Sequence, residues 1–205
     1  GARVRKPLLY DFGGFDDALY RVRYDAPAAT ALADELQRRV PELVRADERP
    51  WDHGVWVPLL HMYPAADVPV LQLSLPGSWT PAALFALGRS LAWLADDGVL
   101  LLASGGAVHN LGALDWSDRA APPAWATDFE GWLRDGLRRG AVEELLAARE
   151  RAPALRRAHP TDEHLLPLFV ALGAASPSGT PPDGVTFPIE GFEYGSLSRL
   201  AVRFG

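Results

Sequence analysis

The sequence contains no cysteine among its 205 residues. This absence excludes a disulfide framework, a cysteine-based zinc site and a thiol nucleophile. A metal ion bound by this chain must therefore be held by histidine, aspartate or glutamate side chains. The same absence is typical of proteins from a reducing compartment.

Excess positive charge and long apolar runs are also lacking. The formal net charge is -6, and lysine and arginine form no basic stripe, which argues against nucleic acid as a partner. The longest apolar runs, such as Val99 to Ala103, are far shorter than the ~20 residues of a membrane span. Residues 1–7 have no apolar signal core. We therefore expect a cytoplasmic protein with no membrane partner.

The middle of the chain predicts a strand, a helix and a second strand. Residues 68–75 are β-rich and apolar, Thr80 and Pro81 are typical of a helix start, and residues 98–104 are apolar on both faces, as central parallel strands are. This βαβ unit predicts an α/β fold, a single domain over residues 1–205 with a central, mostly parallel sheet flanked by helices. Further helices are expected at residues 16–24, 30–40, 128–139 and 161–172, and further strands at 43–45, 185–189 and 197–204. Residues 176–184 are expected to form a loop.

Two catalytic signatures are missing. The glycine pair Gly105-Gly106 has no following Lys-Ser/Thr, so the sequence has no phosphate-binding loop, and no Gly-x-Ser-x-Gly turn occurs. Phosphoryl transfer and serine hydrolysis therefore lack their usual sequence support.

The histidines are few, and their positions are informative: His53, His61, His109, His159 and His164. His109 follows the predicted strand 98–104 and the glycine pair, at the sheet edge where α/β proteins bind ligands. A functional histidine and a hydrogen-bonded loop histidine are both compatible with this position. His164 is expected in the first turn of a helix, where it can be a ligand or a surface residue next to capping side chains. His159, which precedes a proline, is expected to be a turn residue.

His53 lies in a short polar pair between two tryptophans. Asp52 can orient His53 as an acid or base, and Trp51 and Trp56 can line a pocket for an aromatic substrate. The alternative is that both tryptophans are core residues and Asp52 is a turn residue. His61, on an apolar helical segment, is expected to be a packing residue.

Seven short motifs are spread over nearly the whole chain, at residues 10–15, 52–56, 62–69, 105–111, 125–127, 159–173 and 190–198. They occur in the order found in DOPA 4,5-dioxygenases. By these motifs the chain resembles the DOPA 4,5-dioxygenase type of extradiol enzyme, within the class III, protocatechuate 4,5-dioxygenase-like family.

The resemblance implies a non-haem metal, Fe(II) or Zn(II), and a small catechol such as DOPA whose ring is opened with O₂. By motif, His164 resembles a metal ligand, and His109 resembles a histidine at or near the metal that acts as acid or base. His53 resembles a further catalytic histidine close to oxygen and substrate. Trp56, Asn110 and Asp52 are expected to contact the substrate.

The chain departs from the family in one respect. Two segments that each supply a metal-ligand histidine in the family are absent, since no histidine precedes His53. We therefore expect an N-terminally incomplete catalytic domain that lacks the first strands. Two alternatives stay open: a non-catalytic binding protein or truncated inactive relative of the same fold, and a zinc-dependent hydrolase. The sequence leaves the oligomeric state and the cleaved bond undetermined.

Overall fold

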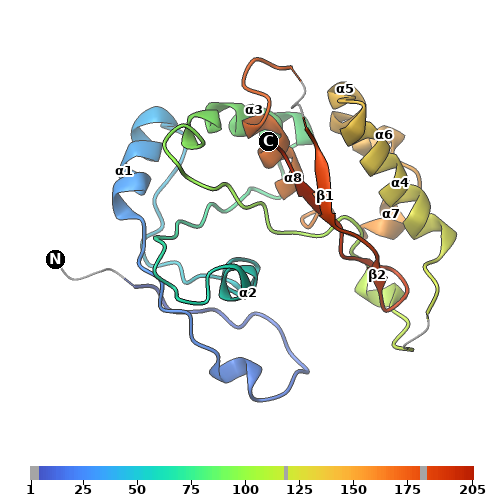
Figure 1. The fold of residues 1–205 in the computed structure, drawn as a ribbon, viewed down its shortest axis with the longest axis horizontal. Coiled ribbons are helices and arrows are strands. Elements are labelled where there is room, and N and C mark those ends of the chain that lie inside the picture. The colour runs from blue at the N-terminus through green and yellow to red at the C-terminus, as the bar shows by residue number, and fades with distance from the viewer. Residues whose placement is uncertain (1–4, 118–119, 181–183) are drawn as a thin grey trace. The chain divides into compact units, whose positions relative to one another are not determined.

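The computed structural model describes residues 5–117, 120–180 and 184–205 (Figure 1). By its contacts the chain divides into two compact units, Gly1–Ser74 and Leu75–Gly205. Each unit has buried apolar residues of its own. The predicted single domain over residues 1–205 stays a prediction.

The first unit is built around aromatic side chains. Its elements are the 3-10 helix η1 (Leu19–Arg21) and the helices α1 (Thr30–Arg39) and α2 (His53–Met62). The buried core consists of Tyr24, Ala26, Trp51 and Trp56. The Tyr24 hydroxyl donates to the Tyr63 carbonyl oxygen at 3.1 Å, so this buried polar group is satisfied. This core supports the start of α2, where His53 lies.

The second unit contains two helices that approach each other closely, α3 (Pro81–Ser90) and α8 (Pro167–Ala174), which lie side by side in Figure 1. A Cβ atom at Gly88 would lie 2.1 Å from the Val170 carbonyl oxygen, and one at Gly173 would lie 2.1 Å from the Phe85 carbonyl oxygen. Glycine at both positions therefore allows backbone-to-backbone contact between the helices. Thr80 caps α3, because its Oγ1 accepts a hydrogen bond from Ala83 N at 3.2 Å.

A second group of helices packs around α4 (Ala124–Arg138). The group contains α5 (Val142–Leu146), α6 (Ala148–Arg151) and α7 (Leu155–Ala158), and the short 3-10 helices η2 (Ala92–Leu94) and η3 (Leu111–Ala113) precede it in the chain. The α4 helix has 15 residues. Across the described parts of the chain, no helix is both long and apolar enough to span a bilayer.

The assigned strands form two small antiparallel pairs. β1 (Thr186–Ile189) pairs with β4 (Ala201–Arg203), and β2 (Phe192–Glu193) pairs with β3 (Leu197–Ser198). The β2–β3 hairpin is tied to α4, because the Ser198 hydroxyl donates to the buried Glu130 carboxylate at 2.5 Å.

The predicted central parallel sheet is not found among the described residues. The parallel pairings there are two isolated bridges, Leu8 with Trp51 and Ala28 with Val70. Gly98 lies in a turn, residues 99–104 have no regular secondary structure and form no ladder, and Leu100 is 59% exposed. The physical reason is that apolar composition favours burial, whereas a strand also needs a partner in register to accept its backbone hydrogen bonds.

The other predicted elements are confirmed or corrected individually. Helices at 30–40 and 128–139 and the strand at 185–189 are confirmed with small shifts of their bounds, whereas 16–24 contains only η1 and 43–45 forms no strand. The helix expected at 161–172 begins at Pro167, because proline is favoured at the first helical position and residues 161–166 form turns instead. Residues 181–183 of the predicted loop 176–184 lie outside the described residues.

Candidate active site

Two segments of the second unit are joined at His109 and His164. The Gly106 backbone N–H donates to the His164 carbonyl oxygen at 2.9 Å, and the His109 N–H donates to the Ala158 carbonyl oxygen at 3.0 Å. These bonds fix the loop after segment 98–104 against the end of α7 and the chain that leads from it to α8. Both histidines thereby have a defined backbone position.

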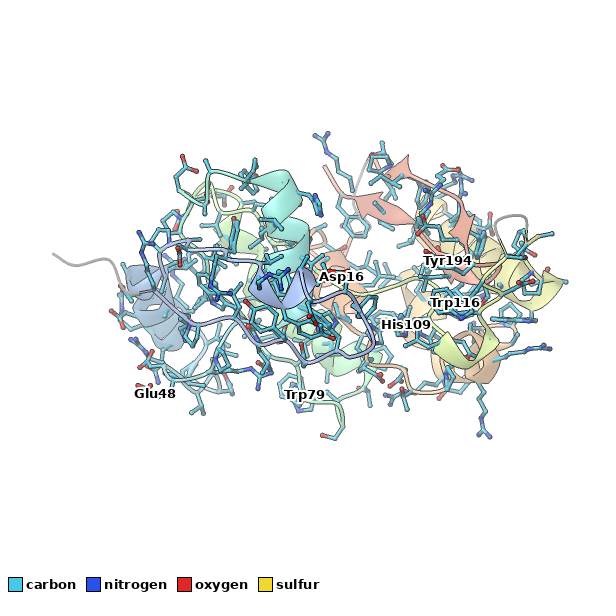
Figure 2. The ribbon with its side chains drawn as sticks, turned by 90° about the horizontal axis from the view of Figure 1, so that it is seen from below. Asp16, Glu48, Trp79, His109, Trp116 and Tyr194 are labelled. Atoms are coloured by element: carbon cyan, nitrogen blue, oxygen red, sulfur yellow. The ribbon has the colours of Figure 1, made fainter. Side chains whose placement is uncertain are left out.

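The two imidazole rings are stacked. Their centroids are 3.6 Å apart and their planes differ by 22°; Figure 2 labels His109. Two imidazolium cations at this spacing would repel each other strongly, whereas neutral rings can stack and keep lone pairs for a metal ion. The structure therefore brings together two of the predicted site residues in an arrangement that suits neutral imidazole.

Gly105 allows the close approach of the two segments. A Cβ atom there would lie 2.2 Å from the His164 carbonyl oxygen and 3.1 Å from the carbonyl carbon. Both neighbours are backbone atoms, which cannot rotate away. Gly105, one of the two glycines noted in the sequence analysis, thus allows the loop to contact the segment that carries His164.

His159 is a buried residue behind this loop, which corrects its expected role as a simple turn residue. Its Nε2 lies 2.8 Å from the Ala107 carbonyl oxygen, and its ring packs edge-on against Phe129 with centroids 5.3 Å apart. Its Nδ1 is buried and has no hydrogen-bond partner among the described residues. Burial lowers the pKa of His159; the hydrogen bond to Ala107 opposes this effect, and the neighbouring His109 and His164 add to it. A neutral ring that donates from Nε2 to Ala107 accounts for these observations.

Glu163 is the carboxylate next to the pair. Its Oε1 lies 3.7 Å from His164 Nε2 and accepts a hydrogen bond from the Thr161 hydroxyl at 2.8 Å. Burial acts to raise the pKa of Glu163, but the hydrogen bonds from the Thr161 hydroxyl and from the backbone of Glu163, together with the two histidines, outweigh it, and the pKa is lowered. Glu163 thus adds negative charge beside His164.

Asn110 is oriented by the same contact between segments. Its Nδ2 donates to the Arg157 carbonyl oxygen at 2.7 Å, which fixes the side-chain amide. Farther along the chain, the exposed side chains of Trp116 and Tyr194, both labelled in Figure 2, form an aromatic pair. Their ring centroids are 4.7 Å apart. The predicted substrate contact of Asn110 stays a prediction.

His53, in the first unit, is paired with a carboxylate that the sequence analysis did not single out. Its Nδ1 lies 2.6 Å from Asp11 Oδ1. The expected partner, Asp52, accepts a hydrogen bond from Gln72 Nε2 at 2.8 Å instead. Asp52 is therefore not the residue that orients His53, because its side chain is engaged with Gln72.

Trp56 lies in the core of the first unit, where only 1% of it is exposed. Its indole Nε1 donates to the Leu9 carbonyl oxygen at 3.1 Å, and its ring contacts Tyr10 with centroids 5.6 Å apart. This arrangement matches the alternative that the tryptophans are core residues. The predicted contact of Trp56 with an aromatic substrate stays a prediction.

The side chains of the histidine pair are of a kind that binds metal ions. Imidazole nitrogen is a common ligand of Fe(II) and Zn(II), and His109 and His164 supply two such groups in one place. Within residues 5–117, 120–180 and 184–205, no group of three or more histidine, aspartate or glutamate side chains is placed to hold a metal ion. The described residues thus supply part of a ligand set.

Comparison with known proteins defines the class. Residues 1–205 match the family described as the catalytic LigB subunit of aromatic ring-opening dioxygenase. The chain belongs to this family of ring-opening dioxygenases. Enzymes of the family are generally dependent on a non-haem metal.

Individual relatives agree with this class. A protein of Escherichia coli (strain K12) named 4,5-DOPA dioxygenase extradiol is 42% identical, over 97% of this chain and 74% of its own length. A Beta vulgaris protein of the same name is 43% identical, over 82% of this chain and 64% of its own length. The crystal structure of an uncharacterized protein from Escherichia coli K12 superposes with a TM-score of 0.79 at 40% identity, over 91% of this chain and 77% of that one.

These similarities confirm the predicted extradiol dioxygenase type and the α/β class of the fold. The chain spans about three quarters of the Escherichia coli relative and less than two thirds of the Beta vulgaris one. An aromatic substrate and O₂ are the reactants that this class of enzyme implies. The roles of the individual site residues stay predictions.

Proposed function

We propose that this chain carries the active centre of an extradiol dioxygenase that opens the ring of DOPA or a related small catechol. The single observation that supports the site is the stacked pair His109 and His164, held by the backbone bonds of two separate segments. The names of the relatives support the catechol, since several are called 4,5-DOPA dioxygenase extradiol.

In this proposal His164 is a ligand of a non-haem metal and His109 lies at or near it. Fe(II) is the preferred metal, because it supplies the redox chemistry that activates O₂, whereas zinc has no redox chemistry. Ring opening inserts both oxygen atoms of O₂ and breaks the carbon–carbon bond beside the catechol hydroxyls, so no external reductant is needed.

The side chains of the protein hold the substrate and move protons. A neutral His109 takes a proton from a catechol hydroxyl and returns it to the opened product, which is the work of a general acid and base. His53 is a second proton-transfer group, and Asn110 and Asp52 are proposed to contact the substrate. Glu163 offsets positive charge that develops near His164.

Oxygen uptake tests the proposal. The protein produced from its own gene is loaded anaerobically with Fe(II) and mixed with L-DOPA in an oxygen electrode, with the absorbance of the product recorded. We expect oxygen uptake and a coloured ring-opened product. His109→Ala should lose turnover by roughly 100-fold or more and keep its fold, whereas His61→Ala, an exposed histidine outside the pair, should behave as the unchanged protein.

Two other results would redirect the assignment. Zinc-dependent activity without oxygen consumption would support the hydrolase alternative. Catechol binding without any turnover in the iron-loaded protein would support the non-catalytic alternative.

A further inference from the structure

The contact between Asp11 and His53 joins two segments that are 42 residues apart. The Nδ1 atom of His53 lies 2.6 Å from Asp11 Oδ1, and the backbone N–H of His53 donates to the same oxygen at 3.4 Å. The Phe12 ring stands edge-on to the imidazole, with centroids 5.8 Å apart and planes at 89°. The imidazole is therefore held by a carboxylate on one edge and by an aromatic ring on another side.

Among the described residues, Asp11 is the only carboxylate that contacts the His53 ring. Asp52, the sequence neighbour of His53, exchanges two hydrogen bonds with Gln72 and lies 3.6 Å from Arg49 Nη2. The partner of His53 is thus set by the tertiary structure.

We propose that Asp11 is the positioning residue that fixes the tautomer of His53 for proton transfer. A carboxylate accepts a hydrogen bond and cannot donate one, so it holds the ring proton at Nδ1 and leaves the lone pair at Nε2. Nε2 then takes a proton from a catechol hydroxyl, and the Asp11 carboxylate stabilises the imidazolium until the proton passes to the ring-opened product. This inference rests on the proposed function, because it gives His53 a substrate to deprotonate.

The partial exposure of His53 and Asp11 indicates that their contact orients the imidazole ring and adds little to the stability of the fold. The side chains of His53 and Asp11 are 44% and 37% exposed. Ion pairs at such positions are screened by water and contribute little to folding. The pKa of Asp11 is lowered: burial acts to raise it, but the hydrogen bond from His53 and the attraction to that ring outweigh burial. A carboxyl that stays ionised can hold the ring in one tautomer.

The test combines a spectroscopic readout with kinetics. Asp11→Asn and Asp11→Ala are compared with Asp17→Asn, which removes the same charge from a nearby exposed residue that makes no hydrogen bond or ion pair within the described chain. The tautomer of His53 is read from two-bond ¹H–¹⁵N couplings of the ring, with His53→Ala used to assign the signals. Turnover of L-DOPA is measured in the iron-loaded protein, with kcat and KM determined separately.

We expect the unchanged protein to hold the Nδ1–H tautomer. In Asp11→Asn the amide can donate to Nδ1, so the Nε2–H tautomer should grow and kcat should fall roughly 10- to 100-fold with little change in KM. Asp11→Ala should give a mixture of tautomers and a similar loss of kcat, whereas Asp17→Asn should leave both readouts unchanged.

Two results would overturn the inference. One is the Nε2–H tautomer in the unchanged protein. The other is an Asp11→Asn variant with normal kcat when His53→Ala has lost turnover. Failure of the proposed function is a separate outcome: if the iron-loaded protein takes up no oxygen with a catechol, the ring couplings still decide whether Asp11 sets the tautomer of His53.

Discussion

Replacement of Gly105 by alanine is the most informative single perturbation of the histidine pair. The φ angle of Gly105 does not lie in the left-handed region, so an alanine can adopt its backbone conformation. The obstacle is space, because the new Cβ would lie 2.2 Å from the His164 carbonyl oxygen. Gly105→Ala therefore acts directly on the distance between the two segments that carry the histidines.

The size of the effect follows from this geometry. Ordinary contact at a Cβ begins at 3.4 Å, so the His164 backbone must retreat by about 1 Å. Overpacking costs about 1–3 kcal/mol, and weakening the 2.9 Å bond between Gly106 N and His164 O costs about 1 kcal/mol more. We expect the free energy of unfolding to fall by about 2–4 kcal/mol. A shift of about 1 Å in a catalytic group lowers kcat/KM by roughly 100-fold.

The assay pairs urea unfolding with oxygen uptake in the iron-loaded protein. Gly131→Ala is the matched control, because Gly131 lies in α4 and its Cβ would meet nothing within 4 Å. The control should keep its activity and gain about 0.5–1 kcal/mol from helix propensity. A Gly105→Ala variant with unchanged stability and unchanged kcat/KM would refute the account of the close approach.

Three further predictions concern stability. Gly88→Ala should lower the free energy of unfolding by about 1–3 kcal/mol in urea titrations, because its Cβ would lie 2.1 Å from the Val170 carbonyl oxygen; a gain in stability would contradict the packing of α3 on α8. Ser198→Ala should cost about 1–3 kcal/mol in the same assay, because it removes a donor from the buried Glu130 carboxylate, and a neutral result would mean that water replaces the hydroxyl. The pKa of His159 is lowered in the folded metal-free protein. As the pH falls below about 6.5, the unfolded chain therefore binds a proton that the folded chain does not. The free energy of unfolding then decreases until the pH reaches the folded-state pKa. His159→Gln should flatten this decline between pH 7 and pH 5.5, and an equally steep decline would assign the effect to other groups.

Local sequence signals predicted helices α1, α3 and α4. Thr80 and Pro81 mark the start of α3, and the structure confirms both the cap and the proline in the first turn. The capping pattern at Thr161 predicts an earlier start for α8 than the structure has, whereas Pro167 is the signal that marks the observed start. Such errors arise where two local signals compete.

Local sequence signals could not predict the contacts between segments that are far apart in the sequence. The apolar segment 98–104 predicted a buried strand, but no pattern within it could say whether a partner strand accepts its hydrogen bonds. His109 and His164 were singled out from their motifs, and the structure places their rings together. Asp11 was missed as the partner of His53, because 42 residues separate the two and the adjacent Asp52 offered a closer candidate in sequence.

The central claim, that His164 is a ligand of a catalytic metal with His109 at or near that metal, is tested most directly by metal content. The protein produced from its own gene is loaded with Fe(II) under anaerobic conditions, freed of excess metal and analysed for iron per chain, together with His164→Ala and the exposed-histidine control His61→Ala. We expect about one iron per chain in the unchanged protein and in His61→Ala, and at least a tenfold loss of affinity in His164→Ala. Equal iron content and affinity in all three proteins would contradict the claim.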